Sequence, residues 1–412
     1  MSHIPMNQNE LFRFLEQSYT PYHAAQNLAD MLSDVGFIPY QGDLSEPSYK
    51  KSGGVLWAIR PGTEPLKKSG VHIVMAHLDS PCFAVKQQAD QFDAMARLSL
   101  ERYGGMNLES FKDIPLRMAG RVFIGGPEKP EERLFVSKQK AVIPSLAVHL
   151  KAENQKDSIQ ENLQALWSLR NRPIQERLIE EMSLEKEDIL AWETYLVSSE
   201  GCTLLDEDSG LFMAPRLDDL SEAYVAIRAL MDCKPTKAAQ LVLLVNHEEI
   251  GSMTSEGAFS PMLLELLERL LLSQGGDRKD YFRMMDACDL VSLDLAHGYH
   301  PNYASRYDKK NAPLLGKGPA IKVSAQGKYA TDTSQRAKLM GLAKQAGIST
   351  QIYQNHSDIK GGTTIGPLTS AMAGIAAVDI GVPILGMHSS LEVACLEDIE
   401  SCIRWMTAYY QA

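Results

Sequence analysis

The adjacent carboxylates Glu248 and Glu249 stand close behind the apolar run of residues 241–245. Five consecutive apolar residues predict a buried strand, and ligands of open α/β sheets bind beyond the carboxyl ends of such strands. Two neighbouring carboxylates can divide the work of a metal site, because one can bind the ion while the other moves a proton. The ion would also offset the repulsion between the two negative charges. On their own, two glutamates at the end of a strand are more commonly just solvated.

Metal-type ligands recur at four other points of the chain, at the end of a predicted strand or at the entrance of a helix. They are His77 with Asp79, Asp218 with Asp219, Asp294, and His388. The predicted strands cover residues 71–75, 290–293 and 382–387, and the predicted helix covers residues 220–231. Imidazole and carboxylate groups suit zinc, and carboxylates also suit manganese or cobalt. With the two glutamates, the set is large enough for two metal ions that share a carboxylate, an arrangement suited to hydrolysis.

The elements that position these residues belong to the two ends of the chain. There, apolar strands alternate with amphipathic helices, which predicts an α/β domain. The middle of the chain is different, because segments such as residues 97–103 and 121–124 predict antiparallel strands. We therefore expect a discontinuous α/β catalytic domain of residues 1–83 and 215–412, with a β-rich domain of residues 84–214 inserted into it.

Composition limits the kind of protein and its partners. The 412 residues are 44% hydrophobic and 23% charged, as in ordinary globular proteins. The 41 basic and 52 acidic residues give a net charge of -11, which disfavours nucleic acid and anionic membranes as partners. The six cysteines are scattered without a C-x-x-C pair, which is typical of reduced cytosolic proteins. Because no signal pattern and no membrane-length apolar run is present, we expect a cytoplasmic location.

The ligand segments, together with several others, resemble the M18 family of metalloaminopeptidases, the aspartyl aminopeptidase group. The resembling segments occur in family order and span most of the chain. They are residues 76–81, 103–105, 143–150, 216–220, 247–252, 294–297, 300–303, 318–322, 364–367 and 387–389. The resemblance implies a zinc-peptidase fold, with a mixed sheet and flanking helices in the catalytic domain. It also implies that the inserted domain mediates dimerisation and that the homodimers build a dodecamer.

Carried over position by position, the resemblance also implies a set of ligands for two divalent metal ions. Asp218 would bridge the two ions. One ion would also bind His77 and Asp294, and the other would also bind Glu249 and His388. Zinc is the metal that we expect, with cobalt or manganese as alternatives.

The resemblance further implies which residues act on a peptide substrate. Glu248 would be the general base that takes a proton from the attacking water, and Asp79 would orient His77. Three other residues match family positions near the substrate: His149, His297 and Lys322. Lys322 is the candidate for contacting a substrate carboxylate. The alternative interpretations are structural, namely packed or capping histidines and a surface lysine.

The chain departs from the family pattern around the substrate pocket. Residues 304–311 lack the histidines that many members have there, residues 355–358 replace a more usual Arg-Asn-Asp, and Leu391 stands where an arginine is common. None of these positions is a predicted metal ligand. We therefore predict a two-metal aminopeptidase with a preference for acidic N-terminal residues. The alternatives are a related hydrolase that prefers neutral or basic N-terminal residues or dipeptides, and a non-catalytic scaffold of the same fold.

Overall fold

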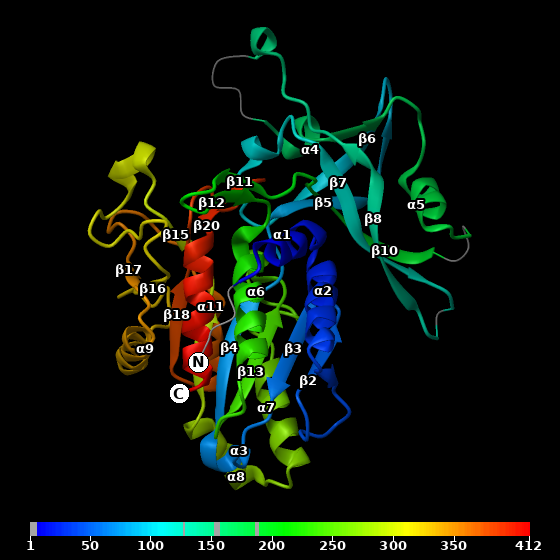
Figure 1. The fold of residues 1–412 in the computed structure, drawn as a ribbon. Helices are drawn as coiled ribbons and strands as arrows, with labels where there is room; N and C mark the ends of the chain where they lie inside the picture. The colour runs from blue at the N-terminus through cyan, green and yellow to red at the C-terminus, as the bar shows by residue number, and fades with distance from the viewer. Residues whose placement is uncertain (1–5, 127, 152–156, 186–188) are drawn as a thin grey trace.

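A computed structural model describes residues 6–126, 128–151, 157–185 and 189–412, and its largest sheet has nine strands. The strands follow one another across this sheet in the order β1-β2-β3-β13-β4-β14-β18-β16-β17. Their bounds are Ile38–Pro39 (β1), Ser48–Ser52 (β2), Val55–Arg60 (β3), Ala239–Val245 (β13), Val71–His77 (β4), Asp289–Leu293 (β14), Ala377–Gly381 (β18), Ala320–Lys322 (β16) and Gln351–Tyr353 (β17). Figure 1 shows this sheet in the lower part of the molecule, with helices in front of it and behind it.

The four central strands of the sheet are parallel, and the strand on each side of them is antiparallel to its central neighbour. Strands β13, β4, β14 and β18 run in one direction, whereas β3 and β16 run against their neighbours β13 and β18. Parallel strands are covered on both faces, so they are apolar throughout rather than alternating. This explains the unbroken apolar run in β13. The parallel arrangement also brings the carboxyl ends of β13, β4 and β14 to one edge of the sheet.

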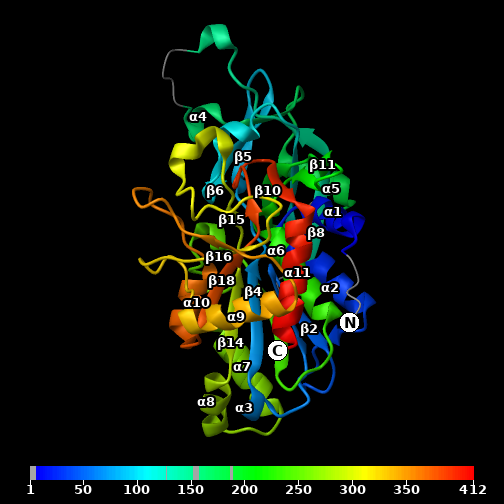
Figure 2. The same ribbon diagram turned by 60° about the vertical axis from the view of Figure 1, so that its left-hand side comes forward.

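Helices cover both faces of the large sheet, and the two faces of β4 contact different groups of them. Val74 and Ala76 belong to the core that contains α1 (Gln8–Gln17), α2 (Pro21–Asp34), α6 (Leu217–Asp232), α9 (Thr333–Gln345) and α11 (Leu396–Tyr410). Ile73 and Met75 belong to the core that contains α3 (Leu66–Ser69), α7 (Met262–Ser273), α8 (Arg278–Asp286) and α10 (Ile365–Ala373). Figures 1 and 2 show α6 and α11 packed along the same face.

A second sheet is antiparallel throughout and has a hydrophobic core of its own. Its six strands follow the order β8 (Glu131–Ala141), β7 (Leu116–Ile124), β10 (Ile189–Ser198), β5 (Cys82–Phe92), β6 (Ala96–Tyr103) and β9 (Ala165–Ser168). Helices α4 (Ile159–Asn162) and α5 (Ile174–Met182) belong to the same part of the chain, at the top of Figure 1. The predicted α/β class with a mixed sheet is confirmed. The division into domains at residues 84 and 214 stays a prediction.

Two small sheets lie next to the segments that carry Asp294 and His388. One contains β11 (Thr203–Asp206), β12 (Leu211–Ala214) and β20 (Glu392–Cys395), and the other pairs β15 (Ala296–His297) with β19 (Pro383–Ile384). The predicted strand over residues 382–387 is confirmed only in part, because two of those residues form β19. Gly386 adopts a φ of 72°, in the left-handed region that favours glycine, so the chain turns before His388. In the described part of the chain, no helix is long and apolar enough to cross a membrane.

Candidate metal centre

Three neighbouring strand ends position four of the predicted site residues. His77 is the last residue of β4, and Asp294 directly follows β14. The short 3-10 helix η4 (Glu248–Ile250) begins three residues after the end of β13 and carries both glutamates. Because β13, β4 and β14 are adjacent and parallel, their ends place these side chains together, as the sequence pattern predicts.

A cavity of about 100 Å³ lies at this edge of the sheet. The predicted residues that line it are His77, Asp218, Glu248, Glu249, Asp294, His297, Lys322 and His388. All five predicted metal ligands and the predicted base thus share one cavity. His149 does not line it, because this residue lies on an exposed 3-10 helix, η2 (Val148–Leu150). Its predicted contact with substrate stays a prediction.

Asp218 lies between the two histidines of the site. His77 Nε2 is 3.6 Å from Asp218 Oδ1, and His388 Nε2 is 3.3 Å from Asp218 Oδ2. His388 Nε2 is also 3.3 Å from Glu249 Oε1. Two ligands on one tetrahedral zinc ion, with bonds of about 2.0–2.1 Å, are about 3.4 Å apart. The spacing therefore fits one ion at each oxygen of Asp218.

The electrostatics of Asp218 also fit a cation. This side chain is 3% exposed, and its Oδ1 has no hydrogen-bond partner among the described residues. Burial alone would raise the pKa of Asp218, but contacts with His388 and His77 hold it below its ordinary value. A buried carboxylate that stays ionised while one oxygen lacks a hydrogen bond needs a positive partner. Ligand atoms of His77, Asp218 and Glu249 lie within 4.8 Å of one another, close enough for one ion.

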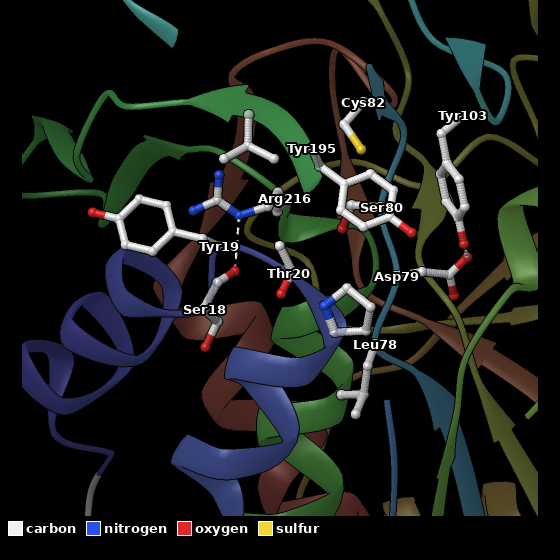
Figure 3. A pocket seen from close by; sticks show the side chains of 12 residues that line it. Ser18, Tyr19, Thr20, Leu78, Asp79, Ser80, Cys82, Tyr103, Tyr195 and Arg216 are labelled. Atoms are coloured by element: carbon white, nitrogen blue, oxygen red, sulfur yellow. Dashed lines mark hydrogen bonds between the residues drawn. The ribbon is translucent and has the colours of Figure 1, made fainter. Parts of the chain in front are cut away.

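The backbone before Asp218 is held in place by a buried arginine. Arg216 has a φ of 58°, in the left-handed region, and Asp218 has non-helical angles (φ -82°, ψ 107°) although it lies in the first turn of α6. The Arg216 guanidinium donates hydrogen bonds to the carbonyls of Leu15, Ser18 and Ser198, at 3.1, 3.0 and 3.2 Å. Figure 3 shows Arg216 pointing towards Ser18. The entrance of α6 is thus fixed to two distant segments.

The loop of His388 is fixed in a similar way. The His388 Nδ1 atom lies 2.8 Å from the Gly105 carbonyl oxygen, which leaves Nε2 to face the carboxylates. Glu392 is 1% exposed and accepts hydrogen bonds from the backbone N–H of His388 at 2.6 Å and of Asp218 at 3.0 Å. Glu392 therefore joins Asp218 to His388. No signal in the sequence marks this residue, since it is one glutamate in the short strand β20.

Asp79 holds the end of β4 against the turn that carries the glutamates. Its carboxylate accepts hydrogen bonds from the backbone N–H of Glu248 at 3.0 Å and of Glu249 at 3.1 Å. It also accepts one from the Tyr103 hydroxyl at 2.8 Å, as Figure 3 shows. The His77 Nδ1 atom lies 3.0 Å from the Asp79 carbonyl oxygen and 3.4 Å from its carboxylate. Asp79 therefore contacts His77 as predicted, but its carboxylate mainly positions the two glutamates.

Lys322 lines the cavity and pairs with a predicted metal ligand. Its ammonium Nζ lies 3.0 Å from Asp294 Oδ1, and the two residues are 3% and 8% exposed. Burial alone would lower the pKa of Lys322, but the charge of Asp294 raises it above its ordinary value. The lysine is therefore not a surface residue. Its charge is shared with Asp294 before any substrate carboxylate binds.

The two glutamates differ in their surroundings. Burial raises the pKa of Glu249 to about 7, and the contact with His388 opposes this shift. Burial raises the pKa of Glu248 to about 8, and the charge of His77 opposes it. Among the described residues, no histidine forms an ion pair with Glu248, whereas Glu249 lies against His388. The arrangement therefore supports a division in which Glu249 binds a metal and Glu248 carries a proton.

Comparison with known proteins assigns the chain to a family. A family model described as aminopeptidase I zinc metalloprotease (M18) matches residues 14–410. The chain belongs to the M18 family. An M18 relative in Clostridium novyi, a probable M18 family aminopeptidase 2, is 32% identical over 411 residues, which is 95% of each chain. The expectation of an M18 metallo-aminopeptidase, a hydrolase of a zinc-dependent family, is therefore confirmed.

Solved structures show that the M18 fold extends over nearly the whole chain. A cryo-EM structure of an Ape4 and Nbr1 complex matches with a TM-score of 0.91 and 27% identity, and covers 98% of this chain and 85% of its own. A structure of the mApe1 dodecamer of S. cerevisiae matches with a TM-score of 0.84 and 22% identity, and covers 98% and 95%.

Proposed function

We propose that this M18 protein is a two-metal aminopeptidase in which Asp218 bridges the two ions. His77 and Asp294 complete one site, and Glu249 and His388 complete the other. The observation that carries this proposal is the position of Asp218, with an imidazole nitrogen 3.3–3.6 Å from each of its oxygens. When bound, the two ions would polarise a water molecule and the carbonyl of the first peptide bond.

Glu248 performs the proton transfers in this proposal. Its side chain lines the cavity, and its backbone is held by Asp79. The Glu248 carboxylate accepts a proton from the water as the water oxygen attacks the carbonyl carbon. The protonated Glu248 then gives that proton to the leaving nitrogen as the carbon–nitrogen bond breaks.

We propose that acidic N-terminal residues are preferred. Lys322 supports this preference because it places a positive charge in the wall of the cavity. The ion pair between Lys322 and Asp294 favours a second candidate, an enzyme that prefers neutral N-terminal residues. Basic N-terminal residues and dipeptides are the remaining alternatives. A panel of aminoacyl chromogenic substrates would decide, because equal rates for Asp, Glu and Ala derivatives would reject the acidic preference.

Zinc is the proposed metal at both positions. The mixed imidazole and carboxylate donors support zinc, although cobalt and manganese also accept such donors. Metal analysis of the purified protein should find about two ions per chain, as the five-ligand set requires. Protein without bound metal that also fails to hydrolyse peptides after addition of zinc, cobalt or manganese would instead be a non-catalytic scaffold.

We further propose a cytoplasmic homo-oligomer, built of dimers through residues 84–214 and reaching a dodecamer. One solved M18 neighbour is a dodecamer. The exposed apolar side chains of this segment in the single chain include Leu146 by 48%, Val148 by 78% and Leu150 by 71%. The six cysteines are free thiols, which supports the cytoplasmic location. Light scattering of the purified protein would measure the assembly, and a monomer would reject it.

A further inference from the structure

A second cavity of about 310 Å³ adjoins the candidate metal centre. The two cavities share three lining residues: His297, Tyr353 and Gly362. The rings of His297 and Tyr353 lie edge to face with their centroids 6.0 Å apart, so this pair stands where the cavities meet. The outer cavity lies between η5 (Pro301–Arg306) with the residues after it and the loop that follows β17. These are the yellow and orange segments at the left of Figures 1 and 2.

Two positive charges in the wall of the outer cavity are unpaired. The described residues offer no side-chain hydrogen bond or ion pair to Arg306 or Lys360, and both are exposed. The acidic residue of the wall, Asp308, already has hydrogen-bond partners of its own. Its carboxylate accepts hydrogen bonds from the Asn311 side chain at 2.7 Å and from the backbone N–H of Lys310 at 3.0 Å. Asp308 keeps its negative charge in these contacts, but Arg306 and Lys360 outnumber it, so the wall of the cavity has a net positive charge.

The residues of the two cavities indicate which part of a peptide enters the outer one. The inner cavity is lined by the proposed metal ligands and Glu248, so the first peptide bond of a substrate lies there in the proposed function. The chain beyond the scissile bond must continue outward. The outer cavity, of about 310 Å³, adjoins the inner one at His297 and Tyr353 and offers space for that part of the peptide.

We infer that this outer cavity binds a carboxylate on the leaving side of the peptide, with Arg306 and Lys360 as its partners. The carboxylate can come from the C-terminus of a short peptide or from an acidic side chain after the scissile bond. Arginine and lysine both form charge-assisted hydrogen bonds with carboxylates. The inference rests on the proposed aminopeptidase function. It adds a specificity determinant that includes Arg306, in the segment 304–311 where the chain departs from the M18 pattern.

The test compares peptides that share their first residue X, chosen from the aminoacyl panel. X-Ala is compared with X-Ala-amide, and X-Glu-Ala-amide with X-Gln-Ala-amide. We expect wild-type kcat/KM to be about ten-fold higher for the charged member of at least one pair, since two positive charges face the ligand. The pair that shows the preference identifies the source of the carboxylate. Equal rates within both pairs would overturn the inference.

The double variant Arg306→Gln/Lys360→Gln should reduce this preference to about two-fold or less, because both partners lose their charge. The ratio within each pair is the readout, so a general loss of activity in the variant cancels. Lys309→Gln removes an exposed lysine that does not line the cavity and should keep the wild-type ratio. A double variant that keeps the preference, or that changes only the choice of X, would overturn the inference. If no X-p-nitroanilide is hydrolysed with any metal, the proposed function fails and this inference falls with it.

Discussion

The Asp79 Oδ1 atom accepts a hydrogen bond of 3.0 Å from the backbone N–H of Glu248. The strand that ends at His77 thus holds the turn that carries the predicted base. The residue before this turn, His247, has a φ of 65°, in the left-handed region that is uncommon for residues other than glycine. The position of the Glu248 backbone therefore depends on its hydrogen bond to Asp79.

Asp79→Asn should lower kcat by about 10- to 100-fold, the usual cost of losing a residue that supports metal ligands. An asparagine has one acceptor oxygen, whereas the N–H groups of Glu248 and Glu249 each bond to a different oxygen of Asp79. Tyr103→Phe is the matched control, because it removes only the hydroxyl that donates to the same carboxylate. It should cost less activity. Wild-type kcat in Asp79→Asn would contradict the positioning role.

Lys322→Met should reduce the hydrolysis of acidic substrates more than that of neutral ones. The substitution removes the positive charge from the cavity wall and leaves Asp294 without its partner. Both rates can therefore fall, and the informative quantity is the ratio of kcat/KM for Asp and Ala derivatives. Lys344→Met changes an exposed lysine on α9 and should leave this ratio as it is. If Lys322→Met keeps the wild-type ratio, Lys322 does not determine the acidic preference.

Asp289→Asn should destabilise the fold near neutral pH but not in acid. The Asp289 carboxylate contacts His72 Nδ1, Lys338 Nζ and Tyr409 Oη, each at 2.6 Å. Burial alone would raise its pKa, but these contacts lower it to about 2, from an ordinary value of 3.8. A lowered pKa stabilises the folded state above about pH 4, and this contribution is lost as the pH falls through about 2.

The shift predicts a loss of about 2 kcal/mol in the free energy of unfolding at pH 7. Urea denaturation of wild type and Asp289→Asn at pH 7, 5 and 3 would measure it. The difference between the two proteins should be similar at pH 7 and 5 and smaller at pH 3. Asp286→Asn replaces an exposed aspartate on α8 and should change little. A difference that grows in acid would contradict this account.

Removal of metal should lower the thermal stability of the protein. The buried carboxylates of Asp218, Glu249 and Glu392 lie close together, and a cation that binds only the folded state stabilises it. At a free-ion concentration of about 1,000 times Kd, one site contributes about 4 kcal/mol. Calorimetry before and after chelation should show a lower Tm, restored by zinc. The Asp218→Asn variant should respond much less, and an equal response would place the stabilising ion elsewhere.

The sequence predicts where the candidate ligands that follow regular strands lie. His77, Glu249 and Asp294 line one cavity as expected, because parallel strands in the centre of a sheet are apolar throughout and their ends are visible in the sequence. The secondary structure of the segment that leads to His388 is harder to predict from the sequence. The apolar run over residues 371–378 fits a helix or a strand, and the structure divides it between the end of α10 and the start of β18.

Contacts between distant segments could not be predicted from periodicity. Lys322 at the end of β16 and Asp294 just after β14 are 28 residues apart, and their ion pair depends on how β16 and β14 are placed in the sheet. Glu392 joins Asp218 and His388 through backbone N–H groups, which leave no pattern in the side chains. Such partners are set by tertiary packing rather than by local sequence.

The Glu248→Gln variant tests the central claim most directly. Glutamine keeps the size of the side chain but cannot accept and return a proton, so kcat should fall by about 1,000-fold. Metal content should stay equal to wild type, because Glu249 and the other four ligands remain. Glu265→Gln, an exposed glutamate on α7, is the control that should keep full activity. Wild-type turnover by Glu248→Gln with a full complement of metal would contradict the assignment of Glu248 as the base.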